Sequence, residues 1–377
     1  MNTLESLFSP ENTEKEKLAR EIANGGDFAS IESELRSKDL LKGEVERVTT
    51  EYYGVLDDLK FLTTQDLEMF TILELYDKEL ALHSIKTYLI AKEKVEKTLA
   101  HDVVLISLFA QEGVSAEQFF RACLLHDIGK VEVPNFILNN TLDSEEMNEL
   151  LKDLVINIKD SATVAKLSEN TDEELDTFDD TTLENLLVKY NLRPSHFVPI
   201  KYIVTPEELK ILAERNFDIN LTLMDIIQVH EKFSGKILTE SGLEIEGALA
   251  GSHHNYHGKG SKHSFRFSTD ALKLSADIAE LIRIADLTEA LEASRSYKQE
   301  GFSRPHILKV ILEEVRVGKI NPKIAYLWID DEIKILENTP SNNFTQKDKE
   351  DINFVKERLE EIYKTLGDDP FPIKEAA

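Results

Sequence analysis

The feature that most constrains this fold is a helical periodicity of apolar residues along nearly the whole chain. Leu67, Phe70 and Leu73 recur at three-residue intervals, and Leu80 continues the pattern. Such spacing places apolar side chains on one face of an α-helix, whereas a half-buried strand needs strict alternation. Alternating runs rich in β-branched residues are few. The sequence therefore predicts an all-α fold built from packed helices.

The acidic balance of the chain limits its partners. Across 377 residues, 71 acids oppose 44 bases for a formal net charge of -27, which repels polyanions and argues against general nucleic-acid binding. A small phosphorylated ligand stays compatible, because clustered cations or a bound metal can dominate the local field. No apolar run reaches the roughly 18 residues of a membrane helix, and no secretory signal is readable. We expect a cytoplasmic protein in which Cys123, set among apolar neighbours, is buried rather than reactive.

Three regions are predicted along the chain. Residues 1–70 form a helical segment with no identifiable chemistry, residues 71–335 form the functional domain, and residues 336–377 form a C-terminal helical tail. A surface helix or helix pair is expected over residues 345–366. One stretch, IAYLWI at residues 324–329, is followed by an Asp-Asp pair and EIKIL, and is compatible with a β-hairpin or with a helix.

The stretch CLLHDIGK, residues 123–130, places a histidine and an aspartate at the end of an apolar run. A buried helix that ends this way delivers an imidazole and a carboxylate into an interior where neither is stable without a partner. Gly129 then lets the backbone turn, and the charge of Lys130 suits a phosphate oxygen. The pair His126-Asp127 is thus a candidate for metal chemistry. The earlier pair at residues 101–102 is explained by an ordinary helix cap or an exposed position.

Four further segments bring metal-binding side chains to the polar edge of apolar helices. These residues are Glu79 and His83, His230, His253 and His254, and Asp286. Taken singly, each has an ordinary explanation as a hydrogen-bonded core residue or a helix cap. Five such segments together favour convergence on one site. Imidazole and carboxylate ligands without thiolates favour iron, manganese or another first-row ion over a structural zinc.

The order of these residues, H…HD…H…HH…D, closely resembles the HD-GYP family, a branch of the HD phosphohydrolase superfamily that hydrolyses cyclic di-GMP. The resemblance runs from about Glu79 to Asp330, through ELALHS, LLHDIGKVEVPNFIL, VHEKFSGKIL, the HH pair, IRIADLTEAL with its trailing RSYK, and GKINPKIA. It implies an HD-domain helical bundle, here with an extra N-terminal helical segment and a helical insertion.

The resemblance also implies roles for individual residues. One ion would be held by His83, His126, Asp127 and Asp286; a second, bridged by Asp127, by His230, His253 and His254; and Glu79 matches a position that admits a third ion in some members. Two or three divalent ions, iron or manganese, are therefore expected. Lys130 would hold a substrate phosphate, with help from Arg295. Asp127 and Lys130 would be catalytic, in a reaction where a metal-bridging hydroxide attacks phosphorus in line with the leaving ribose oxygen.

Two departures from the family leave the substrate open. The family loop has the form HHExxDGxGYP, whereas this chain reads HHNYHGKGSKH from residue 253 and lacks Gly-Tyr-Pro. Lys259 and Lys262 make this loop basic, so they are candidate substrate contacts, with an ordinary solvated loop as the alternative. The second departure is an insertion over residues 152–225, which predicts a lid or an interaction module.

The predicted function is a metal-dependent phosphodiesterase that hydrolyses a cyclic dinucleotide resembling cyclic di-GMP. One alternative keeps the fold and metals but changes the substrate to another nucleotide. The other is a catalytically silent metal-binding scaffold or nucleotide sensor. The expected partner is a small phosphorylated nucleotide, with no membrane. A protein partner at the insertion or N-terminal segment, and a homodimer, stay open.

Overall fold

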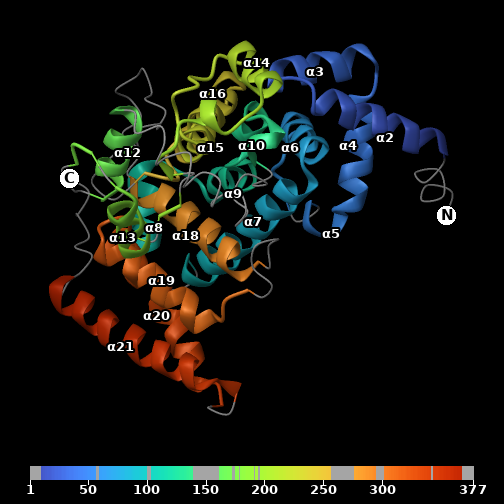
Figure 1. The fold of residues 1–377 in the computed structure, drawn as a ribbon. Helices are drawn as coiled ribbons and strands as arrows, with labels where there is room; N and C mark the ends of the chain where they lie inside the picture. Colours follow the sequence, from blue (N-terminus) through green and yellow to red (C-terminus); the bar gives the residue numbers. More distant parts are fainter. Residues whose placement is uncertain are drawn as a thin grey trace. The chain divides into compact units, whose positions relative to one another are not determined.

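The computed structural model describes residues 10–56, 59–99, 103–138, 161–171, 175–177, 179–190, 192–193, 196–255, 276–293, 301–340 and 343–366. These residues form helices joined by turns, without a β-strand among them (Figure 1). Their isolated antiparallel bridge joins Pro199 and Thr222. The predicted all-α fold is confirmed for the part of the chain described.

The chain packs as two compact units. The first comprises Met1–Leu40 and Gly129–His230; it contains α2 (Pro10–Ala23), α3 (Phe28–Ser37), α10 (Asn135–Leu138), α12 (Ser161–Thr171), α13 (Asp180–Tyr190), η4 (Ile200–Tyr202), α14 (Pro206–Glu214) and α15 (Leu223–Gln228). The second comprises Leu41–Ile128 and Glu231–Ala377; it contains α4 (Leu41–Glu51), α5 (Tyr53–Leu56), α6 (Thr64–Tyr76), α7 (Lys78–Leu99), α8 (Val103–Glu112), α9 (Ala116–Leu125), α17 (Glu244–Ala250), α18 (Ala276–Glu292), α19 (Arg304–Arg316), α20 (Pro322–Asn338) and α21 (Gln346–Leu366). Two elements, η1 (Ile128–Glu132) and α16 (His230–Glu240), begin where the chain passes between units. The functional boundaries predicted at residues 70 and 335 stay a prediction.

Helix α7 is central to the second unit. Its buried residues are spaced by three or four positions and form one continuous stripe: Ala81, Ile85, Tyr88, Ala91 and Val95. The helix packs against α6, α9 and α18. Each large apolar side chain buried in this way contributes about 1.5–3 kcal/mol. This packing fixes both the position and the rotation of α7 and of the side chains on its N-terminal turns.

Capping boxes define where two neighbouring helices begin. Thr63 and Asp66 exchange side-chain to main-chain hydrogen bonds at the start of α6, and Ser115 and Gln118 do the same at the start of α9. Each cap stabilises its helix by about 1 kcal/mol. Because the start of α9 is fixed by its cap and its apolar face is buried, the residues that follow its C-terminal end have a defined position.

Close packing between α16 and α17 depends on a glycine. A Cβ added at Gly247 would lie 2.9 Å from the carbonyl oxygen of Gly235 and 2.5 Å from Oγ1 of Thr239. A side chain at residue 247 would therefore force the two helices apart. The close approach matters for the site, because α17 leads directly into the His253-His254 turn.

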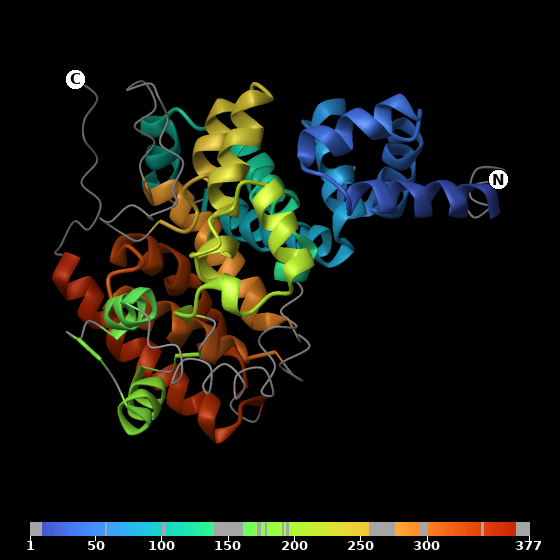
Figure 2. The same ribbon diagram turned by 45° about the horizontal axis from the view of Figure 1, so that its top comes forward.

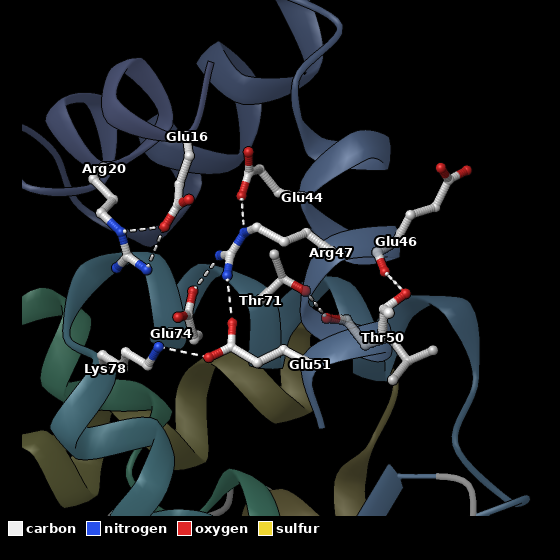
Figure 3. Close-up of polar contacts among 11 residues, drawn as sticks. Glu16, Arg20, Glu44, Glu46, Arg47, Thr50, Glu51, Thr71, Glu74 and Lys78 are labelled. Carbon is white, nitrogen blue, oxygen red and sulfur yellow. Dashed lines mark hydrogen bonds and ion pairs between the residues drawn. The ribbon is translucent and has the colours of Figure 1, made fainter. Parts of the chain in front are cut away.

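A charged network attaches α4 to α6. Figure 3 shows Arg47 between three carboxylates, with nitrogen to oxygen distances of 2.7 Å to Glu44, 2.9 Å to Glu51 and 2.6 Å to Glu74. Glu74 is fully buried, and Lys78 contributes a further ion pair to Glu51 at 2.5 Å. Burial of the guanidinium opposes its charge, but the carboxylates of Glu74 and Glu44 outweigh that effect and raise the pKa of Arg47. The charges are paired, as burial requires.

The C-terminal helices pack together. Helices α19, α20 and α21 lie side by side in both views (Figures 1 and 2). The stretch at residues 324–329 lies within α20, so its interpretation as a β-hairpin is wrong. Asn321 caps this helix, Pro322 occupies its first turn, and Ile324 and Trp328 are buried one turn apart. The predicted helix over residues 345–366 is confirmed as α21.

The predicted insertion has a hydrophobic core of its own. Its described buried residues, from α12, α13 and the following turn, are Val164, Leu167, Leu183, Leu186, Leu187, Phe197 and Val198. These segments of the predicted insertion therefore pack against one another, and a role as a lid or an interaction module stays a prediction. Separately, no helix among the described residues combines the length and apolar character needed to span a bilayer.

Candidate metal centre

His83 is held on both ring nitrogens by carboxylates. It lies near the start of α7, and its Nδ1 donates a hydrogen bond to Oε2 of Glu289 at 2.5 Å. Its Nε2 lies 2.9 Å from Oδ1 of Asp286 and 3.5 Å from Oδ2 of Asp127. Asp286 and Glu289 both belong to α18, so the packing of α7 against α18 creates this arrangement.

His126 and Asp127 follow the C-terminal end of α9, as the sequence predicts. His126 is the C-cap residue and is fully buried. Its Nδ1 lies 2.8 Å from the carbonyl oxygen of Cys123. A carbonyl oxygen can only accept, so Nδ1 carries the proton and Nε2 offers its lone pair to the site. Burial raises the pKa of the Cys123 thiol well above its ordinary value, in agreement with the expected unreactive role.

The His253-His254 pair follows the C-terminal end of α17. Nδ1 of His253 donates to the carbonyl oxygen of Ala250 at 2.6 Å, which repeats the arrangement found at His126. The rings of His126 and His253 meet edge to face with centroids 5.0 Å apart, and the rings of His253 and His254 are 4.0 Å apart. Two separate helix ends thus bring imidazoles to one place.

The donor atoms have the spacing that a divalent ion needs. One group contains His83, His126 and Asp127, and another contains His126, His253 and Asp286; within each group one donor atom per residue lies within 4.8 Å of the others. An octahedral ion with ligands at roughly 2.1 Å places donor atoms about 3 Å apart when adjacent and about 4.2 Å apart when opposite. Nε2 of His126 lies 3.5 Å from Oδ2 of Asp127 and 4.0 Å from Oδ1 of Asp286. Imidazoles and carboxylates at these separations fit a first-row divalent ion.

The electrostatics of the site favour positive charge. Burial alone would lower the pKa of His83, but its hydrogen bonds to Asp286 and Glu289 outweigh burial and raise that pKa to about 9. Burial alone would raise the pKa of Asp286, yet the hydrogen bond from His83 and the surrounding imidazoles hold that pKa well below its usual range. The same carboxylates that stabilise a proton on His83 would attract a divalent cation.

Glu289 contacts the candidate site, and sequence reasoning missed it. It is buried, and its other carboxylate oxygen lies 3.5 Å from Nζ of Lys86. A carboxylate on the far nitrogen of a ligating histidine fixes the ring and increases its basicity. The available signal was the spacing of Asp286 and Glu289, three residues apart on a predicted helix, which places both near the same neighbouring element.

Arg121 connects the helices that lead to these ligands. From α9 its guanidinium donates to Oδ2 of Asp66 on α6 at 3.0 Å, to Oε1 of Glu246 on α17 at 2.5 Å, and to the carbonyl oxygen of Phe61 at 2.9 Å. Asp66 and Glu246 are both buried. The helix that delivers His126 is therefore tied directly to the helix that leads into the His253-His254 turn.

The remaining predicted residues have different outcomes. Glu79 is exposed in the first turn of α7 and belongs to neither group above. His230 is the first residue of α16, and its Nδ1 donates to the carbonyl oxygen of Ile227 at 2.5 Å, as at His126. Lys130 lies in η1, in the first unit. Their roles stay predictions. Outside the described residues lie Lys259, Lys262, Arg295 and the pair His101-Asp102.

Comparison with known proteins supports the HD superfamily. A family model described as HD domain matches residues 80–196, which include His83, His126 and Asp127. No curated protein and no solved structure matches the chain. HD domains are typical of metal-dependent phosphohydrolases, and the grouped histidines and aspartates are side chains that such an ion would bind.

Proposed function

We propose that this chain is a metal-dependent phosphodiesterase that hydrolyses a cyclic dinucleotide of the cyclic di-GMP type. The observation that carries the proposal is the grouping of His83, His126, Asp127 and Asp286, from three helices, at separations that suit one divalent ion. The match of an HD-domain model to the segment with the first three of these residues supports the same reaction class.

In this proposal the grouped side chains would hold two divalent ions, iron or manganese. His83, His126, Asp127 and Asp286 would hold the first, and the resemblance implies that Asp127 would also contribute to the second. The resemblance implies His230, His253 and His254 as the ligands of the second. Nδ1 of His230 and Nδ1 of His253 each donate to a carbonyl oxygen, so in each ring Nε2 is the nitrogen that could bind an ion. Glu79 would contribute only if a third ion binds. Bound divalent ions supply activation of water and neutralisation of phosphate charge.

The protein side chains would perform positioning and charge compensation. Oδ2 of Asp127 lies 3.5 Å from Nε2 of both His83 and His126, so one carboxylate oxygen is close to both imidazoles. Lys130 follows Asp127 by three residues, and we propose that its ammonium group holds a substrate phosphate. Arg295, Lys259 and Lys262 are proposed as further phosphate contacts, because a chain with a net charge of -27 needs local cations to bind an anion.

The choice of a cyclic dinucleotide rests on the resemblance to HD-GYP proteins. The loop HHNYHGKGSKH lacks the Gly-Tyr-Pro of that family, and this departure favours another nucleotide as a second candidate substrate. A site that contains every ligand position but cannot orient substrate would instead serve as a metal-bound nucleotide sensor. The three readings differ in what is hydrolysed.

A hydrolysis panel separates these readings. The purified chain, loaded with Mn²⁺ or with Fe²⁺ under anaerobic conditions, would be incubated with cyclic di-GMP, cyclic GMP-AMP, linear dinucleotides and nucleoside mono- and diphosphates. The proposal predicts release of a linear dinucleotide or mononucleotide from a cyclic substrate, abolished by chelator and restored by metal. Turnover of mononucleotides alone would favour the second substrate class. Binding of a nucleotide without turnover of any would favour the sensor.

A further inference from the structure

The main chain of the His253-His254 turn is held by charged side chains on both sides. The amide of His254 donates to Oε1 of Glu231, on α16, at 3.1 Å. The carbonyl oxygen of His254 accepts from Arg283, on α18, at 3.2 Å, and the same nitrogen lies 3.4 Å from the carbonyl oxygen of Asn255. The peptide groups that flank His254 are therefore fixed by a buried carboxylate and a guanidinium.

Arg283 is itself held in place from the other side. Its second terminal nitrogen donates to Oε2 of Glu314 on α19 at 3.0 Å, and the other oxygen of Glu314 lies 3.0 Å from Nζ of Lys319. The Arg283 side chain is only 11% exposed. A guanidinium presents several donors in a rigid plane, so Arg283 can bind the main chain of the turn and Glu314 on α19 at the same time.

The two histidines of the turn differ in how they are oriented. His253 is oriented by its own helix end, through the bond from Nδ1 to the carbonyl oxygen of Ala250. For His254, the contacts with Glu231 and Arg283 are made by the main chain. A shift of this peptide would move the His254 imidazole relative to the ring of His253, whose centroid lies 4.0 Å away.

We propose that Arg283 is a positioning residue for the second divalent ion, acting through the peptide of His254. This inference rests on the proposed two-metal function. Arg283 precedes the proposed ligand Asp286 by three residues on α18. One helix would therefore supply a ligand of the first ion and the anchor of a ligand of the second, which fixes the separation of the two ions.

Manganese binding tests this role directly. Metal-free protein would be reconstituted with Mn²⁺, and metal content and electron paramagnetic resonance spectra recorded. The wild-type chain is expected to bind two Mn²⁺ and to give a spin-coupled spectrum. Arg283→Met, which keeps the aliphatic stem, is expected to weaken the binding of one of the two ions by about 10–100-fold. Its spectrum should then show the six lines of an isolated ion. Arg283→Lys, which retains one donor group, should fall between them.

Two further variants keep the test decisive if Arg283→Met folds poorly. Glu314→Gln removes the charge that pairs with Arg283 but keeps the guanidinium. It is expected to weaken binding of the same ion by a smaller factor. Arg304→Met is a matched control, because Arg304 is a part-buried arginine paired with Glu292 and Glu332 away from the turn. It should retain both ions.

The outcomes distinguish this inference from the proposed function. Two ions and an unchanged coupled spectrum in Arg283→Met and Glu314→Gln would overturn the role of Arg283 alone. Equal weakening of both ions in Glu314→Gln would also overturn it, because the effect would then be general. A wild-type chain that binds fewer than two Mn²⁺ at saturation would overturn the two-metal function itself.

Discussion

The site contains two kinds of histidine, and they depend on different parts of the fold. His126 and His253 are oriented locally, because each bonds through Nδ1 to a carbonyl oxygen three residues earlier at a helix end. His83 is oriented by Glu289, a residue 206 positions away in the sequence. The first kind requires only that its own helix ends correctly, whereas the second requires that α7 and α18 pack in register.

This difference shows why perturbations of the site should not be equivalent. A change in a helix-end histidine acts on the ligand alone, since its orientation comes from the main chain. A change in α18 can disturb His83 without touching it, because both partners of the imidazole are on that helix. Variants that act on the two kinds separately can therefore break or sharpen the comparison.

The largest effect is expected where the two kinds of histidine share a carboxylate. Asp127 lies 3.5 Å from Nε2 of both His83 and His126. In the proposed enzyme, Asp127→Asn removes a charged ligand and should reduce kcat by roughly 10⁴-fold, or about 5.5 kcal/mol. Steady-state kinetics of the Mn²⁺-loaded variant would measure this. Asp330→Asn, a change on α20 at a residue paired with Lys334, is the control. Retention of turnover by Asp127→Asn would contradict the role of this residue.

The next largest effect is expected at Arg121, which connects the helices that precede the two locally oriented histidines. Arg121→Met leaves the buried carboxylates of Asp66 and Glu246 without their shared cation, which should cost about 3–4 kcal/mol of the free energy of unfolding. Urea denaturation measures the loss. Arg316→Met is the matched control, since that arginine is 57% exposed and its ion pair among the described residues is with Glu313 on the same helix, and should change stability by less than about 0.5 kcal/mol. Similar stabilities for both variants would show that the network does not hold α9 and α17 together.

Metal binding at His83 should depend on Glu289, its partner on α18. Glu289→Gln keeps the size of the side chain but removes the charge that faces Nδ1 of His83, and should weaken Mn²⁺ binding by about 10–100-fold. Calorimetric titration would measure the affinity. Glu292→Gln, three residues later on α18 and paired with Arg304, is expected to leave it unchanged. Equal affinities in wild type and Glu289→Gln would remove the distinction between the two kinds of histidine.

The smallest effect concerns the pH dependence of α18 itself. Burial raises the pKa of Glu280 to about 7, against a bond from the amide of Asn321 that acts in the opposite direction. The fold thus favours the neutral carboxyl, so this contribution to stability is complete below about pH 4.5 and is lost as pH rises through 7. At pH 8, Glu280→Gln should raise the melting temperature, with a gain in the free energy of unfolding on the order of 1 kcal/mol. At pH 4.5 the substitution should have little effect. An equal change at both pH values would contradict the raised pKa.

Local patterns predicted much of this architecture and part of its site. Helical periodicity predicted the all-α fold, and the His126-Asp127 pair at the end of an apolar run predicted a buried imidazole and carboxylate at the end of α9. These features depend on residues close in sequence, so a single chain carries the information. The stretch at residues 324–329 was ambiguous because a short apolar run suits a buried strand or a buried helix equally.

The residues that support the ligands could not be predicted in the same way. Arg283 and Glu289 are ordinary charged residues on an amphipathic helix. Their spacing does not indicate which helix packs against α18 or at which position along it. Their roles follow from tertiary packing that brings α7 and α19 against α18. The same limit applies to Arg121, whose partners lie on two other helices.

The most direct test of the central claim is an anomalous difference map from crystals grown with Mn²⁺. The account predicts an ion within roughly 2.0–2.3 Å of Nε2 of His83, Nε2 of His126 and a carboxylate oxygen of both Asp127 and Asp286. Saturating Mn²⁺ or Fe²⁺ with no anomalous peak among these four side chains, and with His83 still hydrogen-bonded to Asp286, would contradict it.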